Sequence, residues 1–173
     1  MRIVIVQVSI HHHNTAKISE AMAAAIGAQM MSITEAANSP AESWDLLGLG
    51  SGIFFGAHHK SLLRFASQLQ NPPAASFLYS TAGLPSLGWL WHRSLRQIMA
   101  RKSIPVLGEA CFAGWDTVGP LRWIGGVQRG RPNQHDLDRA ARFAKHVVSR
   151  MQDFRPDHPT ESSERANVSQ LTN

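Results

Sequence analysis

Residues 2–15 read RIVIVQVSIHHHNT, and this stretch decides the fold. Its apolar run, residues 3–8, predicts a buried strand that passes directly into the polar segment of residues 9–15. A helix is expected at once, because apolar residues recur every four positions over residues 18–26. Backbone N–H groups at a helix N-terminus lack internal partners, and the helix dipole adds positive potential there. Strand, polar loop and helix start therefore form a cradle for an anionic phosphate.

Several side chains of this loop can donate hydrogen bonds to such a phosphate. They are those of Ser9, His11, His12, His13, Asn14 and Thr15. A simpler interpretation stands beside this one, in which Asn14 or Thr15 only caps the helix. The rest of the chain favours the phosphate site.

Length and composition predict one globular domain. The chain has 173 residues, of which 43% are hydrophobic and 17% charged, and it has a single cysteine, Cys111. An intrachain disulfide is therefore impossible, which fits a reducing compartment. The start MRIVIVQV does not read as a signal peptide, and the apolar runs fall short of the roughly 20 residues that a membrane span needs. We expect a cytoplasmic protein without a membrane span.

The chain is basic, with 17 Lys and Arg against 12 Asp and Glu and a net charge of +5. This balance favours anionic partners such as a phosphate ligand or an acidic protein. The basic residues are not interleaved with the aromatic residues that an RNA-binding sheet uses for stacking. We therefore expect no nucleic-acid partner, and most of the charge is expected on ordinary solvated helix faces.

Apolar runs alternate with amphipathic segments along the chain. Strands are expected over residues 2–8, 29–33, 45–51, 76–80 and 104–112, and helices over 15–26, 59–69, 87–101 and 134–152, with at most a short helix in 34–43. This alternation predicts a parallel sheet with helices on both faces. The domain is expected to span residues 1–154, followed by a polar, disordered tail over residues 155–173.

Ligands of such sheets bind beyond the carboxyl ends of the strands, so three loops matter most, over residues 9–15, 51–59 and 80–86. The second contains Gly52-Ile53-Phe54-Phe55-Gly56, whose glycines allow close backbone approach to a flat ligand and whose phenylalanines offer apolar faces. The alternative is a tight turn with core aromatics. The third contains Ser80-Thr81-Ala82-Gly83, with small side chains and free N–H groups. Together the loops could hold a phosphate, a flat ring and the polar edge of that ring.

These pieces resemble the flavodoxin family, and most closely its branch whose first loop reads S-x-H-H-x-N-T. Other pieces match in order: the strand over 45–51, the segments 52–56 and 80–83, Gly114-Trp115-Asp116-Thr117, and Gly130-Arg131-Pro132-Asn133 before the final helix. The resemblance covers residues 1–152. It implies an α/β fold, a three-layer α/β/α sandwich with a five-stranded parallel sheet of order 2-1-3-4-5.

The resemblance also implies non-covalently bound FMN and electron transfer. By position, Ser9, His11, Asn14 and Thr15 would hold the phosphate, with His12 and His13 lining the loop. The isoalloxazine ring would contact Gly52, Ile53, Phe54, Phe55 and Gly56 on one edge and Ser80, Thr81, Ala82 and Gly83 on the other. The flavin would carry the chemistry, so no catalytic residue is expected. The implied partner is a redox protein or a small-molecule electron acceptor.

Two departures from ordinary flavodoxins stand out: the first loop lacks their glycine, and the chain is basic where they are acidic. Less negative charge near the flavin would make its reduced, anionic form easier to reach.

Other interpretations are weaker. Gly48-Leu49-Gly50 is not a dinucleotide fingerprint, because Ile53 stands where the third glycine belongs. Adjacent histidines point apart and make a poor zinc site. Cys111 lies inside an expected strand and reads as a small buried hydrophobe.

Two function classes stay open: an FMN-dependent carrier or reductase, and a flavodoxin-fold binding module without flavin that acts through its basic surface and the 113–133 loop.

Overall fold

The structure is a computed structural model, and it describes residues 1–10, 13–39, 44–115 and 128–154. The predictions for His11, His12, most of the 113–133 loop and the C-terminal tail lie outside the described residues. The elements are β1 (Ile3–Val8), α1 (Asn14–Ile26), β2 (Gln29–Met31), α2 (Ile33–Ala37), β3 (Leu46–Phe54), β4 (Ala57–His58), α3 (Lys60–Gln68), β5 (Ala75–Ala82), the 3-10 helix η1 (Pro85–Leu87), α4 (Gly88–Trp91), α5 (Arg93–Arg101), β6 (Val106–Ala113) and α6 (Gln134–Asp153).

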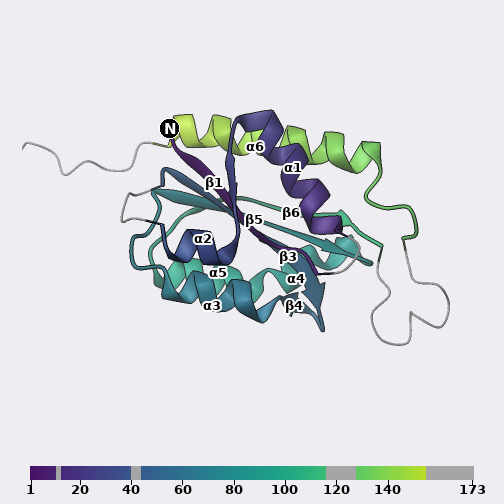
Figure 1. Cartoon of the computed structure of the whole chain (residues 1–173), viewed down its shortest axis with the longest axis horizontal. Helices are drawn as coiled ribbons and strands as arrows, with labels where there is room; N and C mark the ends of the chain where they lie inside the picture. The colour runs from purple at the N-terminus through teal and green to yellow at the C-terminus, as the bar shows by residue number, and fades with distance from the viewer. Residues whose placement is uncertain (11–12, 40–43, 116–127, 155–173) are drawn as a thin grey trace, which may run out of the picture.

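The main sheet has the order β2-β1-β3-β5-β6, with parallel pairing throughout. Counted along the chain without β4, these five strands have the expected order 2-1-3-4-5, so the α/β fold prediction is confirmed. The two-residue strand β4 pairs antiparallel with the end of β3 and forms a hairpin that the sequence analysis did not predict. The carboxyl ends of the parallel strands meet at the right-hand end of the molecule in Figure 1.

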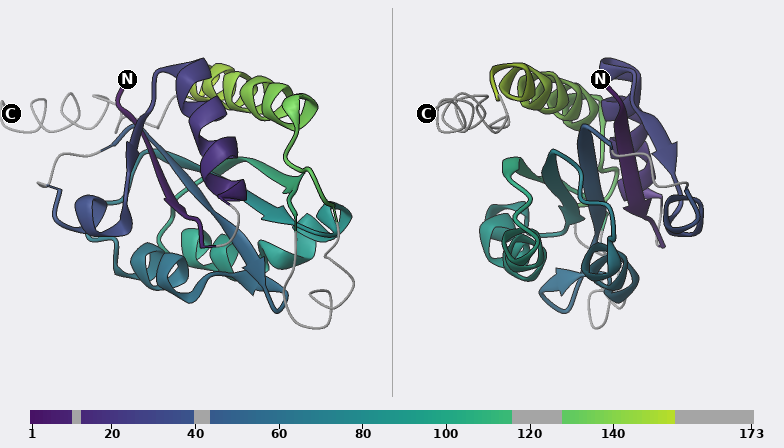
Figure 2. Two further views of the ribbon diagram at one scale, coloured as in Figure 1. Left: turned by 45° about the vertical axis from the view of Figure 1, so that its right-hand side comes forward. Right: turned by 90° about the vertical axis from the view of Figure 1, so that its left-hand side faces the viewer.

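Helices cover both faces of the sheet and make three layers (Figures 1 and 2). Successive side chains of a strand point to opposite faces. In β1, Ile3 and Ile5 therefore pack in the core beneath α1 and α6, and Val4 and Val6 pack in the core on the side of α2, α3 and α5. Both faces are buried, which is why β1 is apolar at every position of residues 3–6.

Two glycines of β3 have a packing role. Gly48 and Gly50 pair in register with Phe77 and Tyr79 of β5. An added Cβ would lie 2.3 Å from the Phe77 ring at Gly48 and 2.0 Å from the Tyr79 ring at Gly50. Both rings thus occupy the space that a side chain on β3 would fill, and the Gly-x-Gly pattern serves the core.

The ends of several elements differ from the predictions. Strand β3 continues to Phe54, so the loop expected over residues 51–59 is mostly strand and hairpin. The single helix expected over 87–101 is three pieces, η1, α4 and α5. Gly88, at the start of α4, packs directly on Cys111, with 2.6 Å from its ideal Cβ to the Cys111 Cβ. Among the described residues, none of the helices combines the length and apolar character that a membrane span requires.

The variant Gly50→Ala is expected to lower the free energy of unfolding by about 1–3 kcal/mol, because the new methyl group overpacks the core against Tyr79. Urea unfolding checks this. In the double variant Gly50→Ala/Tyr79→Leu the smaller side chain makes room, so the combined loss should be less than the sum of the single losses. Strictly additive losses would contradict the assigned contact.

Candidate functional site

Three segments meet at the carboxyl edge of the sheet. The Thr15 hydroxyl at the start of α1 lies 2.8 Å from the Thr81 hydroxyl at the end of β5. Asn14 Nδ2 donates to the Trp115 carbonyl oxygen at 2.8 Å. Between them lies Gly114, whose N–H donates to the Ala82 carbonyl oxygen and whose ideal Cβ would be only 3.0 Å from Asn14 Nδ2. The start of α1, the end of β5 and the segment after β6 are therefore held in direct contact.

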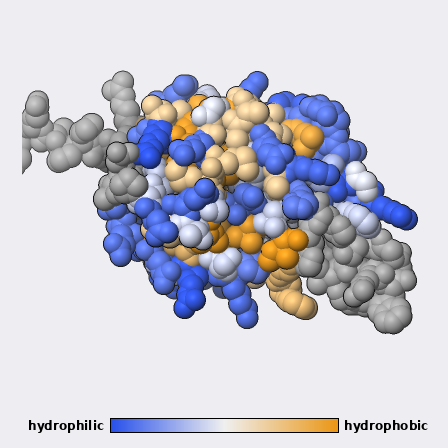
Figure 3. Space-filling view, viewed as in Figure 1, coloured by the Kyte–Doolittle hydropathy of each residue, from blue (hydrophilic) through white to orange (hydrophobic). Residues whose placement is uncertain are grey.

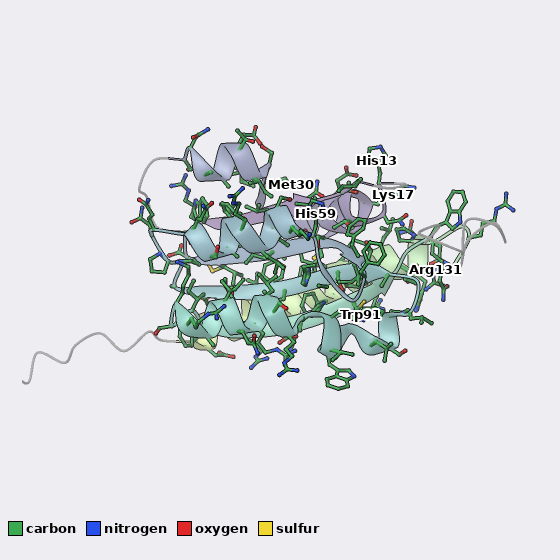
Figure 4. The ribbon with its side chains drawn as sticks, turned by 90° about the horizontal axis from the view of Figure 1, so that it is seen from below. His13, Lys17, Met30, His59, Trp91 and Arg131 are labelled. Atoms are coloured by element: carbon green, nitrogen blue, oxygen red, sulfur yellow. The ribbon has the colours of Figure 1, made fainter. Side chains whose placement is uncertain are left out.

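The positive end of α1 is less neutralised than the equivalent ends of α2 and α6. The latter two begin with capping boxes that include Glu35 and Asp136, respectively. Within the described part of the chain, the α1 N-cap His13 has φ 52° and makes no side-chain cap, and the first turn of α1 has no acidic residue. Instead the exposed His13 and Lys17 lie here (Figure 4). Acidic residues usually stabilise this end of a helix, so the arrangement is suited to an external anion.

The predicted phosphate donors fall into two groups. Asn14 and Thr15 are buried, and their side chains bind Trp115 and Thr81. Neither is the cap of α1, so the simpler capping interpretation is not observed. Ser9 is half-buried, and its Oγ accepts a hydrogen bond from the Ala16 N–H at 3.4 Å. The groups at the rim are therefore Ser9, His13 and the backbone at the start of α1.

The second predicted loop is the tip of the β3–β4 hairpin. Gly52, Ile53 and Phe54 are strand residues, and the turn consists of Phe55 and Gly56, both at positive φ, 50° and 81°. Two-residue hairpin turns of this kind favour Asn-Gly, because left-handed backbone is costly for most other residues. The Phe55 side chain is 98% exposed, so no packing within the described chain compensates. In Figure 3, apolar side chains project at this tip.

The third predicted loop is also partly strand, because β5 extends to Ala82. Thr81 and Ala82 are buried residues of β5, and Gly83 follows them. The connection to α5 then exposes large apolar side chains, those of Leu84, Leu87, Trp89 and Leu90. The half-buried Trp91 faces the hairpin, with 4.0 Å from the ideal Cβ of Gly56 to its ring. Figure 4 shows Trp91 at the same end of the molecule as His13, Lys17 and Arg131.

Ser80 belongs to a buried polar cluster that the sequence analysis missed. Its hydroxyl lies 2.8 Å from His92 Nε2, and His92 Nδ1 lies 3.2 Å from Glu109 Oε2. The same carboxylate pairs with Arg96 Nε at 2.9 Å. Ser80 is fully buried on the α5 face of β5, so its side chain does not line the rim. The sequence offered no signal, because His92 and Glu109 are 17 residues apart and meet only when β6 lies beside β5.

A second histidine completes this cluster. His58 stacks on His92 with ring centroids 5.0 Å apart, and its Nδ1 lies 2.9 Å from Ser51 Oγ. Burial, followed by the charge of His92, lowers the pKa of His58 to about 3. Among the described residues, no group of three His, Cys, Asp or Glu side chains is arranged to hold a metal ion.

Cys111 borders the cluster and is buried, as predicted. Burial raises the pKa of its thiol, although a hydrogen bond from Ser80 opposes the shift. A neutral thiol is a poor nucleophile, so Cys111 packs as a small apolar group.

Replacing Phe55 by Asn is expected to raise the free energy of unfolding by about 1 kcal/mol, because Asn tolerates left-handed backbone better than Phe. The comparison is Gly56→Ala at the next residue, which should destabilise the protein because Gly56 has φ 81°. Thermal unfolding of both variants tests the pair. A loss of stability in Phe55→Asn would show that the aromatic ring packs on the protein.

The variant Thr15→Val should cost about 1–3 kcal/mol of stability, since it leaves the buried Thr81 hydroxyl without its partner. Adding Thr81→Val removes the orphaned group and should recover most of that loss. Denaturant unfolding of both single variants and the double variant gives the coupling energy. A coupling near zero would rule out a direct bond between α1 and β5.

Comparison with known proteins agrees with this geometry. No protein-family model matches the chain. The uncharacterized protein MJ0298 of Methanocaldococcus jannaschii is 37% identical over 148 residues, which cover 86% of this chain and 99% of that protein.

Among solved structures, a WrbA-like flavodoxin from Agrobacterium tumefaciens aligns with a TM-score of 0.62 at 14% identity, over 90% of this chain and 100% of that chain. A flavodoxin from the domain Archaea aligns with a TM-score of 0.57 at 14% identity, over 88% and 99%. The rubredoxin oxygen:oxidoreductase of Desulfovibrio gigas aligns with a TM-score of 0.62 at 11% identity, and this chain covers 88% of its own length but only 36% of that protein. The chain therefore belongs to the same family as MJ0298, and its fold is the flavodoxin-like fold.

Proposed function

We propose that this protein binds FMN and works as a flavodoxin-like electron-transfer protein or reductase. The observation that carries the proposal is the start of α1 at the carboxyl edge of a flavodoxin-like sheet, where, among the described residues, the N-cap His13 makes no side-chain cap and the first turn has no acidic residue. Flavodoxins and a WrbA-like flavodoxin share this fold, which supports a flavin as the ligand.

The phosphate of FMN would lie at this helix start. Lys17 adds positive charge near a helix end that normally prefers negative charge. A bound phosphate would add negative charge at the positive end of α1, which is a favourable interaction. It would also accept hydrogen bonds from free N–H groups at the helix start. Ser9, which directly follows β1, is placed to add a hydroxyl donor.

The flavin ring would lie between the hairpin tip and the end of β5. Phe55 supports this location, because backbone strain at an exposed residue is typical of ligand-contacting turns. Gly56 and Trp91 face each other beside it. On the opposite edge lie Ala82, whose side chain is a single methyl group, and Gly83, which has none.

When bound, the flavin supplies the redox chemistry, and the protein binds it, orients it and excludes water. The exposed Leu84, Trp89 and Leu90 support a contact surface for a redox partner or a small-molecule acceptor. The net charge of +5 favours an acidic partner and also favours a reduced, anionic flavin.

The second candidate is a flavodoxin-fold binding module without flavin. The observation in its favour is that the side chains of Asn14, Thr15 and Ser80 bind protein groups instead of facing the rim. Such a module would act through its basic surface and the 113–133 loop.

Absorbance spectroscopy separates the two candidates. The purified protein should show flavin bands, or gain them when flavin-free protein is mixed with FMN. Failure to bind excess FMN would overturn the first proposal and leave the binding module. If flavin is bound, bleaching by NAD(P)H alone would identify a reductase, and bleaching only through a redox protein would identify a carrier.

The double variant Asn14→Ala/Thr15→Val is expected to weaken FMN binding by about 2–4 kcal/mol. The two side chains hold the start of α1 against β5 and Trp115, so their loss displaces the phosphate donors. Titration of flavin-free protein by fluorescence measures the affinity. The matched control is Asn71→Ala/Thr34→Val, which makes the same chemical changes at exposed residues. Equal FMN affinities in the variant and the control would show that the phosphate of FMN does not bind at the start of α1.

A further inference from the structure

The connection between β5 and α5 is attached to the protein by little apolar packing. Its large side chains are exposed to solvent, since Leu84 is 60%, Trp89 68% and Leu90 43% exposed. Burial of apolar side chains normally holds such a segment in place, and here that contribution is small. Gly88 packs directly on Cys111 of β6, but a glycine contributes no side chain of its own. Polar contacts are therefore important for the position of this segment.

One arginine side chain makes two of these polar contacts. Arg96 Nη2 donates to the Trp89 carbonyl oxygen at 2.7 Å, and Arg96 Nε donates to Glu109 Oε1 at 2.9 Å. A planar guanidinium group holds its N–H donors in a fixed arrangement, so it can make both bonds at once. The Arg96 side chain therefore links α4 to β6.

The Trp89 carbonyl group needs this donor because α4 ends early. In one continuous helix it would accept a hydrogen bond from the backbone N–H of Arg93. Here α4 covers only Gly88–Trp91, and α5 begins anew at Arg93. The last four carbonyl groups of a helix lack helical donors. Arg96 supplies such a donor from the beginning of the next helix.

The carboxylate at the other end of this link is itself held in place. Glu109 Oε2 lies 3.2 Å from Nδ1 of the buried His92, and Oε1 binds Arg96. Burial raises the pKa of Glu109, but the hydrogen bond with His92 and the charge of Arg96 outweigh burial and lower it. Glu109 is therefore ionised near neutral pH, and both of its oxygens are bound. An ion pair within such a network contributes more than an isolated surface pair.

The segment that Arg96 holds ends in Trp91, beside the proposed location of the flavin ring. The ring of Trp91 lies 4.0 Å from the ideal Cβ position of Gly56 in the hairpin tip. Trp91 comes two residues after the carbonyl group that Arg96 binds. The position of α4 therefore sets how the Trp91 ring approaches the hairpin.

We propose that Arg96 and Glu109 are positioning residues for the flavin site, which hold α4 so that Trp91 can contact the flavin ring. This inference rests on the proposed function. Arg96 belongs to α5 and Glu109 contacts His92 on the same side of the sheet, so both act through Trp91. Without Arg96, α4 loses the bond to the Trp89 carbonyl group and Trp91 becomes more mobile. Flavin binding then has to order this segment, which lowers the affinity.

The test compares Arg96→Met with the matched control Arg93→Met, which changes an exposed arginine of the same helix. Both variants keep a long unbranched side chain and lose one positive charge. Titration of flavin-free protein with FMN, followed by flavin fluorescence, should show about tenfold weaker binding in Arg96→Met and nearly wild-type affinity in Arg93→Met. Arg96→Lys should recover little of the loss, because an ammonium group does not reproduce the planar arrangement of donors.

A double-variant cycle tests whether Arg96 acts through Trp91. In a Trp91→Leu background, the further change Arg96→Met should leave the FMN affinity almost unchanged, because the ring that Arg96 positions is gone. At saturating FMN, the visible circular dichroism of the bound flavin should differ between Arg96→Met and wild type and agree between Arg93→Met and wild type. An equally large effect of Arg96→Met without Trp91 would overturn the inference, as would equal affinities in folded Arg96→Met and Arg93→Met.

A measurement on flavin-free protein separates this inference from the proposed function. Backbone hydrogen exchange over residues 84–92 should be faster in Arg96→Met than in wild type or Arg93→Met, with unchanged exchange in β1. Unchanged exchange over residues 84–92 would overturn the attachment of α4 by Arg96, whether or not FMN binds. Faster exchange in a protein that never binds FMN would instead overturn the proposed function and, with it, the role of Trp91. The two failures are therefore distinguishable.

Discussion

A parallel sheet covered on both faces has room for polar side chains only near its ends, and the rest of this structure depends on that constraint. In β1, β3 and β5 the residues that precede the carboxyl edge pack into one of two apolar cores. Where the strands end, hydroxyl and amide groups replace aliphatic ones on both faces: Thr15 with Thr81 under α1, and Ser51 with Ser80 under α5. The same edge is where such folds bind ligands.

The two polar groups at this edge differ in chemistry. On the α1 face, Thr15, Asn14 and Gly114 hold three segments together by neutral hydrogen bonds and close packing. On the α5 face, the buried His92 contacts Glu109, whose partly exposed carboxylate also pairs with Arg96. One face therefore holds together the segments of the proposed flavin site by neutral groups, and the other has an ion pair between Arg96 and Glu109. Both meet on β5, where Ser80 and Thr81 are consecutive residues that point to opposite faces.

The Phe55-Gly56 turn shows a conflict between local preference and tertiary context. Local preference favours Asn at the first position, yet the chain has an exposed phenylalanine with φ 50°. Such conflicts are expected where a residue serves a ligand or partner, since natural sequences otherwise agree with their local structure. The exposed Leu84, Trp89 and Leu90 have the same character, because each is a large apolar side chain left in solvent next to the edge.

By itself the sequence determined the fold and the location of the candidate site. Apolar runs at strand length and apolar spacing at helix length are local signals, so the parallel sheet covered by helices and the loop of residues 9–15 could be predicted from them. The strand order was predicted only from the resemblance to the flavodoxin family. Tertiary structure alone decided what each polar side chain binds. Thr15 and Thr81 are 66 residues apart, and a local sequence pattern cannot relate residues at that separation. His92 meets Glu109 only because β6 pairs with β5. Side-chain direction at a strand end depends on strand register, and a one-residue slip of β5 would turn Ser80 from the α5 face to the α1 face.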